Sequence, residues 1–123
     1  VGIIMNTKNK INNYLKKDGN IILQIGKTFG HLYQSIFFEE IYSITEGPPP
    51  EVNLSNEKNN GEAVLKLIND KLAFSVHDIS AGGLILALAE MTLSSGFGLK
   101  INKPQNLSNL MEHYFGLYFH LLI

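Results

Sequence analysis

The sequence predicts an α/β or α+β domain in which a mixed sheet is flanked by helices. Short apolar runs bounded by glycine or polar residues are typical of buried strands, and stretches with apolar residues at helical spacing lie between them. The chain has 123 residues, of which 45% are hydrophobic, and this is enough for one core. Residues 1–123 therefore form a single domain or a fragment of a much longer protein.

Four apolar runs predict buried strands, at residues 1–5, 21–26, 72–76 and 97–101. The turn signal Asp18-Gly19 lies in the polar link between the first two runs, so these strands are expected to be neighbours in one sheet. We expect residues 72–76 to form a central strand. Because the chain opens directly on a strand pattern, we expect it to be a segment of something longer.

Helical spacing of apolar residues predicts helices within residues 27–45, at 57–71 and at 82–94. The three successive prolines of the connector at 46–58 forbid a helix there. Asn53 and Asn106 are interpreted as loop residues entering helices, and Asn109 with Glu112 matches a capping box. The stripes expected to face the core are Leu32, Ile36, Phe37, Ile41 and Ile44 in the first helix, Val64, Leu65 and Ile68 in the second, and Leu84, Leu88 and Met91 in the third.

Composition excludes several classes of function. The net charge of −1 favours neither nucleic acid nor an anionic membrane as a partner. The chain has no cysteine, which excludes disulfides, thiolate catalysis and cysteine-rich zinc sites. It has no signal peptide pattern and no apolar run of about 18 residues, so the expected location is the cytoplasm. The segments at 37–42 and 114–123 are too apolar to be bare, and we expect them to pack against each other, against other domains, or in a dimer.

The stretch "SVHDISAGGLILALAEM", residues 75–91, is the strongest candidate for a site. A sharp passage from strand to helix leaves the first helical N–H groups free to attract an anion, phosphate especially. Ser80 can cap the helix or donate to a phosphate, Gly82 and Gly83 allow close approach, and Asp78 can hold magnesium beside phosphates. The same residues also suit a purely structural cap and a tightly packed helix. His77 is best interpreted as a half-buried, hydrogen-bonded histidine, since the four histidines show no metal-ligand spacing.

Three collinear motifs resemble phosphoribosylformylglycinamidine synthase, the ATP-dependent amidotransferase of purine biosynthesis. The stretch "HDISAGGLILALAEM" resembles the family's His-Asp-x-Ser-Asp-Gly-Gly-Leu followed by Ala-Leu-Ala-Glu-Met. Upstream, "IGKTFGHLYQS" resembles Gly-x-Thr-x-Gly-His-Leu-Gly-Gln-Ser. Between them, "EGPPPEVNLSNEKNNGEAV" resembles a Pro-Pro-x-Val-Asp-Leu, Glu-(Lys/Arg), Asn-Gly run. Together the matches cover residues 1–103.

The resemblance implies a place within a longer ligase. It points to the C-terminal α/β domain of the second half of the synthetase part, a fold of the aminoimidazole ribonucleotide synthase-like superfamily. It implies ATP or ADP and Mg²⁺ as cofactors, with Ser80, Gly82 and Gly83 binding nucleotide and Asp78 binding the metal at a non-catalytic site. It places no catalytic residue in this segment, so the isolated chain should be inactive. The implied partners are other domains of the parent synthase, a glutaminase domain or subunit, and nucleotide.

Three departures from the family pattern stand out. Ala81 replaces a second aspartate, Tyr33 replaces a glycine, and the tail "LYFHLLI" replaces a Glu-x-Gln-x-Arg-type strand. Two other interpretations stay open. One is a non-catalytic scaffold or interaction domain. The other is the same domain of a related ATP enzyme, such as aminoimidazole ribonucleotide synthase, selenophosphate synthetase or thiamine-monophosphate kinase.

Overall fold

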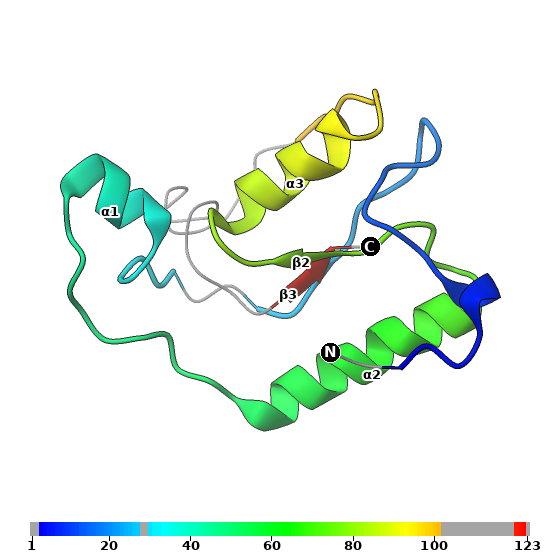
Figure 1. Ribbon diagram of the computed structural model, residues 1–123, viewed down its shortest axis with the longest axis horizontal. Coiled ribbons are helices and arrows are strands. Elements are labelled where there is room, and N and C mark those ends of the chain that lie inside the picture. The colour runs from blue at the N-terminus through cyan, green and yellow to red at the C-terminus, as the bar shows by residue number, and fades with distance from the viewer. Residues whose placement is uncertain (1–2, 28–29, 102–119, 123) are drawn as a thin grey trace.

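The computed structural model describes residues 3–27, 30–101 and 120–122 (Figure 1). Helices and short strands are mixed along these residues, in agreement with an α/β or α+β class. In chain order the elements are the 3-10 helix η1 (Thr7–Asn9), β1 (Gln24–Ile25), α1 (Ile36–Tyr42), α2 (Leu54–Asn69), β2 (His77–Ile79), α3 (Gly83–Leu93) and β3 (His120–Leu122).

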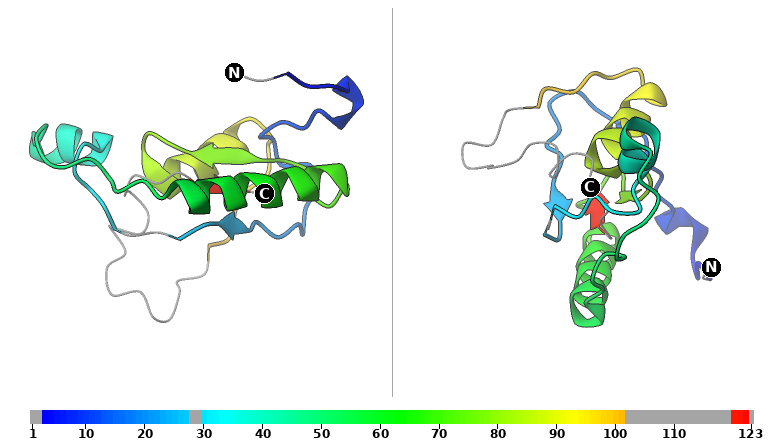
Figure 2. Two further views of the ribbon diagram at one scale, coloured as in Figure 1. Left: turned by 90° about the horizontal axis from the view of Figure 1, so that it is seen from below. Right: turned by 90° about the vertical axis from the view of Figure 1, so that its left-hand side faces the viewer.

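The three short strands form one sheet in the order β1-β3-β2. Both pairs are antiparallel: Gln24 lies opposite Leu122, and Asp78 lies opposite Leu121. Figures 1 and 2 show α3 on one side of this sheet and α2 on the other. In the described part of the chain, parallel pairing occurs at an isolated bridge between Asn12 and Ser75. The domain is therefore layered, with a narrow sheet between two helices.

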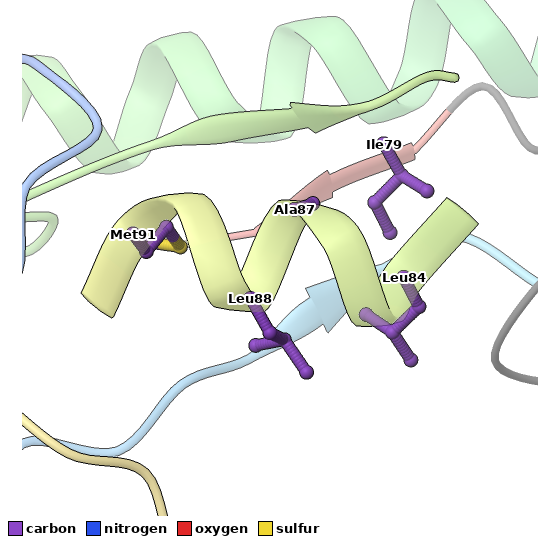
Figure 3. Close-up of a cluster of buried hydrophobic side chains, with 5 residues drawn as sticks. All are labelled: Ile79, Leu84, Ala87, Leu88 and Met91. Carbon is purple, nitrogen blue, oxygen red and sulfur yellow. The ribbon is translucent and has the colours of Figure 1, made fainter. Parts of the chain in front are cut away.

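The main core lies between α3 and the sheet. Figure 3 shows Ile79 of β2 directed toward α3, and Ile79 belongs to one buried cluster with side chains of that helix. Leu84, Leu88 and Met91 are buried in this cluster together with Ala87, and Met91 is fully buried. The predicted packing of the third helix through Leu84, Leu88 and Met91 is confirmed. Replacement of such a buried methionine by alanine typically costs about 2–5 kcal/mol of stability.

The predicted helices are present, with different bounds. The helix predicted at 82–94 is α3, with Gly82 and Ser94 as its caps. Helix α2 begins three residues earlier than predicted because the Asn53 side chain accepts a hydrogen bond from the backbone N–H of Asn56 at 2.9 Å. Asn53 therefore enters a helix, as predicted. Helix α1 is shorter than predicted, since Ser35 caps its start and Ser43 ends it in the left-handed conformation.

Two of the predicted strands are wrong. Residues 3–5 form no strand and Met5 is 94% exposed, so the prediction of a buried strand at 1–5 fails where the structure describes it. Residues 97–101 also form no strand and instead follow the turn at Gly96. The run at 21–26 is a strand only at Gln24–Ile25. A short apolar run becomes a strand only where a neighbouring strand can pair with it, and none of the described strands lies beside residues 3–5 or 97–101.

The expected central strand at 72–76 is also wrong. The strand in this region is β2, His77–Ile79, and it lies at the edge of the sheet. The central strand is β3, from the apolar tail. In the part of the chain that the structure describes, residues 72–76 pair through Ser75 at the bridge to Asn12 and through the Val76 N–H, which donates to the Asn12 carbonyl at 3.0 Å. The rest of the tail, at 114–119 and 123, and the capping box at Asn109 lie outside the described residues, as does Asn106.

Candidate functional site

The candidate site begins at strand β2, which carries Asp78 at its middle position. Side chains alternate along a strand, so His77 and Ile79 share one face and Asp78 projects away from it. Ile79 is 2% exposed, whereas the Asp78 side chain is 71% exposed. We expected Asp78 to lie in the turn at the start of the helix; the structure instead presents it to solvent from within a paired strand, before that turn.

A tight turn then leads the chain from β2 into α3. The Gly83 N–H donates to the Ser80 carbonyl at 3.1 Å, and both Gly82 and Gly83 have positive φ angles. A Cβ atom on Gly82 would lie 2.7 Å from the Cβ of Leu86. This turn thus requires glycine at position 82 for two reasons, the backbone angle and the lack of space.

The first turn of α3 has no side-chain cap. Its N-cap residue is Gly82, and no acidic residue lies in the first turn. The expectation that the Ser80 side chain might cap this helix is therefore not met, because the helix begins three residues further on. Ser80 stays exposed beside the turn. The start of the helix, which no side chain caps, and the exposed Ser80 hydroxyl lie close in the chain to the Asp78 carboxylate.

The His77 side chain lies between two carboxylates. Its Nε2 atom is 2.8 Å from Oε2 of Glu90 on α3, and its Nδ1 atom is 3.4 Å from Oδ1 of Asp78. The side chain is 11% exposed, so the expected hydrogen-bonded histidine is present and is more deeply buried than the half-buried side chain that we expected. Nδ1 is buried and has no hydrogen-bond partner among the described residues.

Sequence reasoning missed Glu90 as a partner of this site. A signal was present, because Glu90 is the single charged residue in the mostly apolar sequence of α3. Helical spacing places it on the same side as Gly83 and Ala87, both of which are buried. The Glu90 side chain is itself 49% exposed, and its carboxylate reaches the His77 side chain, which is 11% exposed.

The fit of this site to a metal ion is partial. No group of three histidine, aspartate or glutamate side chains that could hold a metal occurs in the part of the chain that the structure describes. Asp78 provides one exposed carboxylate, and Ala81 provides none at the position where the family pattern has a second aspartate. The residues present suit one part of a shared site, whose other metal ligands would come from elsewhere.

The second motif is tied to the proline-rich connector. His31 Nε2 lies 2.9 Å from the Pro48 carbonyl, and the Gln34 side-chain amide donates to the Gly47 carbonyl at 2.8 Å. The Tyr33 ring lies directly over Gly47, where a Cβ would approach ring carbon Cδ1 to 2.3 Å. The bulky ring of Tyr33 is thus accommodated by the absence of a side chain at position 47.

The chain is similar to known proteins over most of its length. Residues 17–120 match the family model described as AIR synthase related protein, C-terminal domain. The chain is 49% identical over 116 residues to phosphoribosylformylglycinamidine synthase subunit PurL of Pelagibacter ubique, a match covering 94% of this chain and 16% of that protein. The same subunit of Bradyrhizobium diazoefficiens is 43% identical over 82% of this chain and 14% of its own length. That of Bartonella bacilliformis is 44% identical over 81% of this chain and 13% of its own length.

The family model matches residues 17–120, and the structure has a tight glycine turn between a strand and an apolar helix in that region. The chain therefore belongs to the family of AIR synthase related proteins, as their C-terminal domain. Its curated relatives are PurL subunits of phosphoribosylformylglycinamidine synthase, which confirms the resemblance found in the three motifs. The chain spans between 13% and 16% of the length of these relatives.

Proposed function

We propose that the chain works as one domain of an ATP-dependent phosphoribosylformylglycinamidine synthase in purine biosynthesis. The whole enzyme would convert formylglycinamide ribonucleotide to the amidine, with ATP activating the amide oxygen and ammonia from glutamine displacing phosphate. The family match over residues 17–120 and the names of the relatives support this assignment. Such a reaction forms a C–N bond at the expense of ATP, so the parent enzyme is a ligase.

Within that enzyme, this chain would help to hold a nucleotide rather than perform the chemistry. Asp78 would bind Mg²⁺, and Ser80 with the backbone of Gly82 and Gly83 would face the phosphates of ATP or ADP. Mg²⁺ would neutralise phosphate charge at the site. The observation that carries the proposal is the exposed Asp78 carboxylate, four residues before Gly82, the N-cap of a helix without a side-chain cap.

The rest of the assembly follows from the same assignment. We place the chain in the cytoplasm, beside the other domains of the synthase and a glutaminase domain or subunit. There the narrow antiparallel sheet would be part of a mixed sheet flanked by helices, because the outer edges of β1 and β2 have no strand beside them among the described residues. None of the described helices has the length and apolar character needed to cross a membrane.

The test is Asp78→Asn in the complete synthase subunit that carries this chain. The substitution removes the charge and keeps the size of an exposed side chain, so the fold should remain intact. We expect nucleotide that copurifies with the protein to be lost, as measured by release of bound nucleotide and chromatography. Asp70→Asn is the matched control, since Asp70 is an exposed carboxylate that pairs with Lys66 at the end of α2.

A second candidate function is that of a non-catalytic interaction domain. The observation that favours it is the exposure of large apolar side chains, including Ile41 at 65% and Leu72 at 64%. The two functions differ in the Asp78→Asn experiment: unchanged nucleotide content and unchanged stability would leave Asp78 as an ordinary surface residue and favour the interaction domain.

A further inference from the structure

Strand β2 is a weak support for a ligand-binding carboxylate unless other contacts fix it. It has three residues, and among the described strands it lies at the edge of the sheet and pairs on one side only, with β3. Short edge strands open more easily than central ones, because few backbone hydrogen bonds hold them. A carboxylate at the middle of such a strand would lose its position whenever the strand opens.

The two residues that flank Asp78 are both anchored to α3. Ile79, on one side, is 2% exposed and packs in the cluster around Met91. His77, on the other side, reaches Glu90 through Nε2 at 2.8 Å. One anchor is apolar and the other is a charge-assisted hydrogen bond, and together they fix the backbone on both sides of an exposed aspartate.

The second nitrogen of His77 points to a role beyond packing. An ionised Glu90 carboxylate only accepts hydrogen bonds, so Nε2 carries the proton of this contact. Nδ1 is then left buried without a hydrogen-bond partner in the described residues, at 3.4 Å from Oδ1 of Asp78. Unsatisfied buried polar atoms are uncommon in folded proteins, and a simple tie between strand and helix does not require one.

We propose that His77 and Glu90 form a positioning pair, in which Glu90 holds the His77 ring so that strand β2 presents the Asp78 carboxylate to a bound cation. The proposal rests on the proposed function, since it concerns the same nucleotide site. His77 and Glu90 touch neither metal nor nucleotide in this arrangement and act through Asp78. Both belong to the stretch "HDISAGGLILALAEM", whose two halves the contact joins across the turn.

Matched substitutions separate the anchor from the ring itself. His77→Gln places an amide N–H at the reach of Nε2 and keeps the contact with Glu90, whereas His77→Asn is too short to make it. Glu90→Gln keeps an acceptor on α3, and Glu90→Ala removes it. The measurement is the Mg²⁺ concentration that half-saturates ADP retention by the complete synthase subunit. We expect His77→Asn and Glu90→Ala to raise it about tenfold or more, the usual effect of losing an outer partner of a metal ligand. The Mg²⁺ midpoints of His77→Gln and Glu90→Gln should stay close to that of the unsubstituted protein.

Two further measurements exclude a merely structural role. Thermal unfolding is followed for each variant, because a structural defect would lower the unfolding temperature without moving the Mg²⁺ midpoint of the folded protein. The double variant His77→Asn/Glu90→Ala should have the same Mg²⁺ midpoint as each single variant, since each single substitution already removes the same contact. Equal Mg²⁺ midpoints for His77→Asn and His77→Gln, or for Glu90→Ala and the parent, would overturn the proposal. If His77→Asn does not fold, the comparison of Glu90→Ala with Glu90→Gln tests the proposal instead.

Asp78→Asn separates this proposal from the proposed function. If Asp78→Asn releases nucleotide while His77→Asn and Glu90→Ala do not move the Mg²⁺ midpoint, the positioning pair is refuted and the nucleotide site stands. If Asp78→Asn has no effect on retained nucleotide, the nucleotide site is refuted and the positioning pair falls with it.

Discussion

At the scale of the residue, the turn between β2 and α3 depends on Gly82, where a side chain cannot be added without strain. Gly82 combines a φ of +83° with a Cβ direction that points at Leu86, 2.4 Å from its Cδ2 atom and 2.7 Å from its Cβ. The Cβ of Leu86 is attached to the backbone of α3 and cannot turn away. The same residue is the N-cap of α3, so the geometry of Gly82 also determines where the free N–H groups of the helix begin.

A series of three alanine substitutions separates the two constraints on Gly82. At Gly98 the φ angle is not positive and no atom lies near the new Cβ. At Gly19 the φ angle is positive but no atom is near. At Gly82 the φ angle is positive and the new Cβ would also clash with Leu86. The left-handed conformation costs alanine about 1–2 kcal/mol. We therefore expect the free energy of unfolding in urea to change little for Gly98→Ala, to fall by about 1–2 kcal/mol for Gly19→Ala, and to fall further for Gly82→Ala. Equal losses for Gly19→Ala and Gly82→Ala would show that Leu86 moves aside freely.

Sequence reasoning located the residues of the junction but not their contacts. Residue type and order were enough to single out Asp78, Ser80, Gly82 and Gly83, because a strand-to-helix turn needs such residues. The contact between His77 and Glu90 spans 13 residues and depends on how α3 lies across β2, which no local pattern encodes. Whether these residues bind nucleotide stays a prediction for the experiments above.

At the scale of the element, helices were predictable and strands were not. The signals of a helix are local: the cap at Asn53, the cap at Ser35, and apolar residues at a spacing of three and four. A strand depends on its partner, and here the partner of both β1 and β2 is β3, at the far end of the chain. The apolar run at 72–76 has the composition of a central strand, yet the antiparallel ladder begins only at His77.

Helix α1 exposes several large apolar side chains to solvent. Figure 1 shows it at one end of the molecule, away from the sheet. The rings of Phe37, Phe38 and Tyr42 contact one another, but Ile41 remains 65% exposed and Tyr42 57% exposed. A patch of this kind on a domain that spans about a sixth of its relatives is a candidate interface with the rest of the synthase.

The substitution Ile41→Glu tests this interface. In the isolated chain it should leave the free energy of unfolding within about 0.5 kcal/mol, because an exposed side chain loses no packing. In the complete subunit a charge would be buried without a partner, so the thermal unfolding temperature and the yield of soluble protein should fall. Glu40→Lys, at an exposed polar position of the same helix, is the control and should be neutral in both. No effect of Ile41→Glu on the complete subunit would mean that α1 faces solvent there.

At the scale of the whole molecule, the proposed function needs groups from outside this chain. Asp78 is the one carboxylate that we assign to the proposed nucleotide site, and no metal-binding group of three side chains is found within the described residues. The chain also exposes apolar side chains on α1 and at Leu72 and Phe74. Both features are what a domain shows when it meets its neighbours in a longer protein, and both agree with relatives about six times its length.

The isolated chain should therefore form no amidine product. Amide activation requires ATP, the substrate amide and ammonia to be held in reacting geometry, and such positioning supplies a large share of an enzyme's rate. Within the described residues, His77 Nε2 is already in contact with Glu90, and no group of three possible metal ligands is found. The measurement is product formation from formylglycinamide ribonucleotide, ATP, Mg²⁺ and ammonium salt, with the complete subunit as the positive control. We expect turnover at the rate without enzyme for the chain alone. Turnover above that rate, abolished by Asp78→Asn, would show that the catalytic groups lie in this chain, and the assignment of a supporting domain would have to be abandoned.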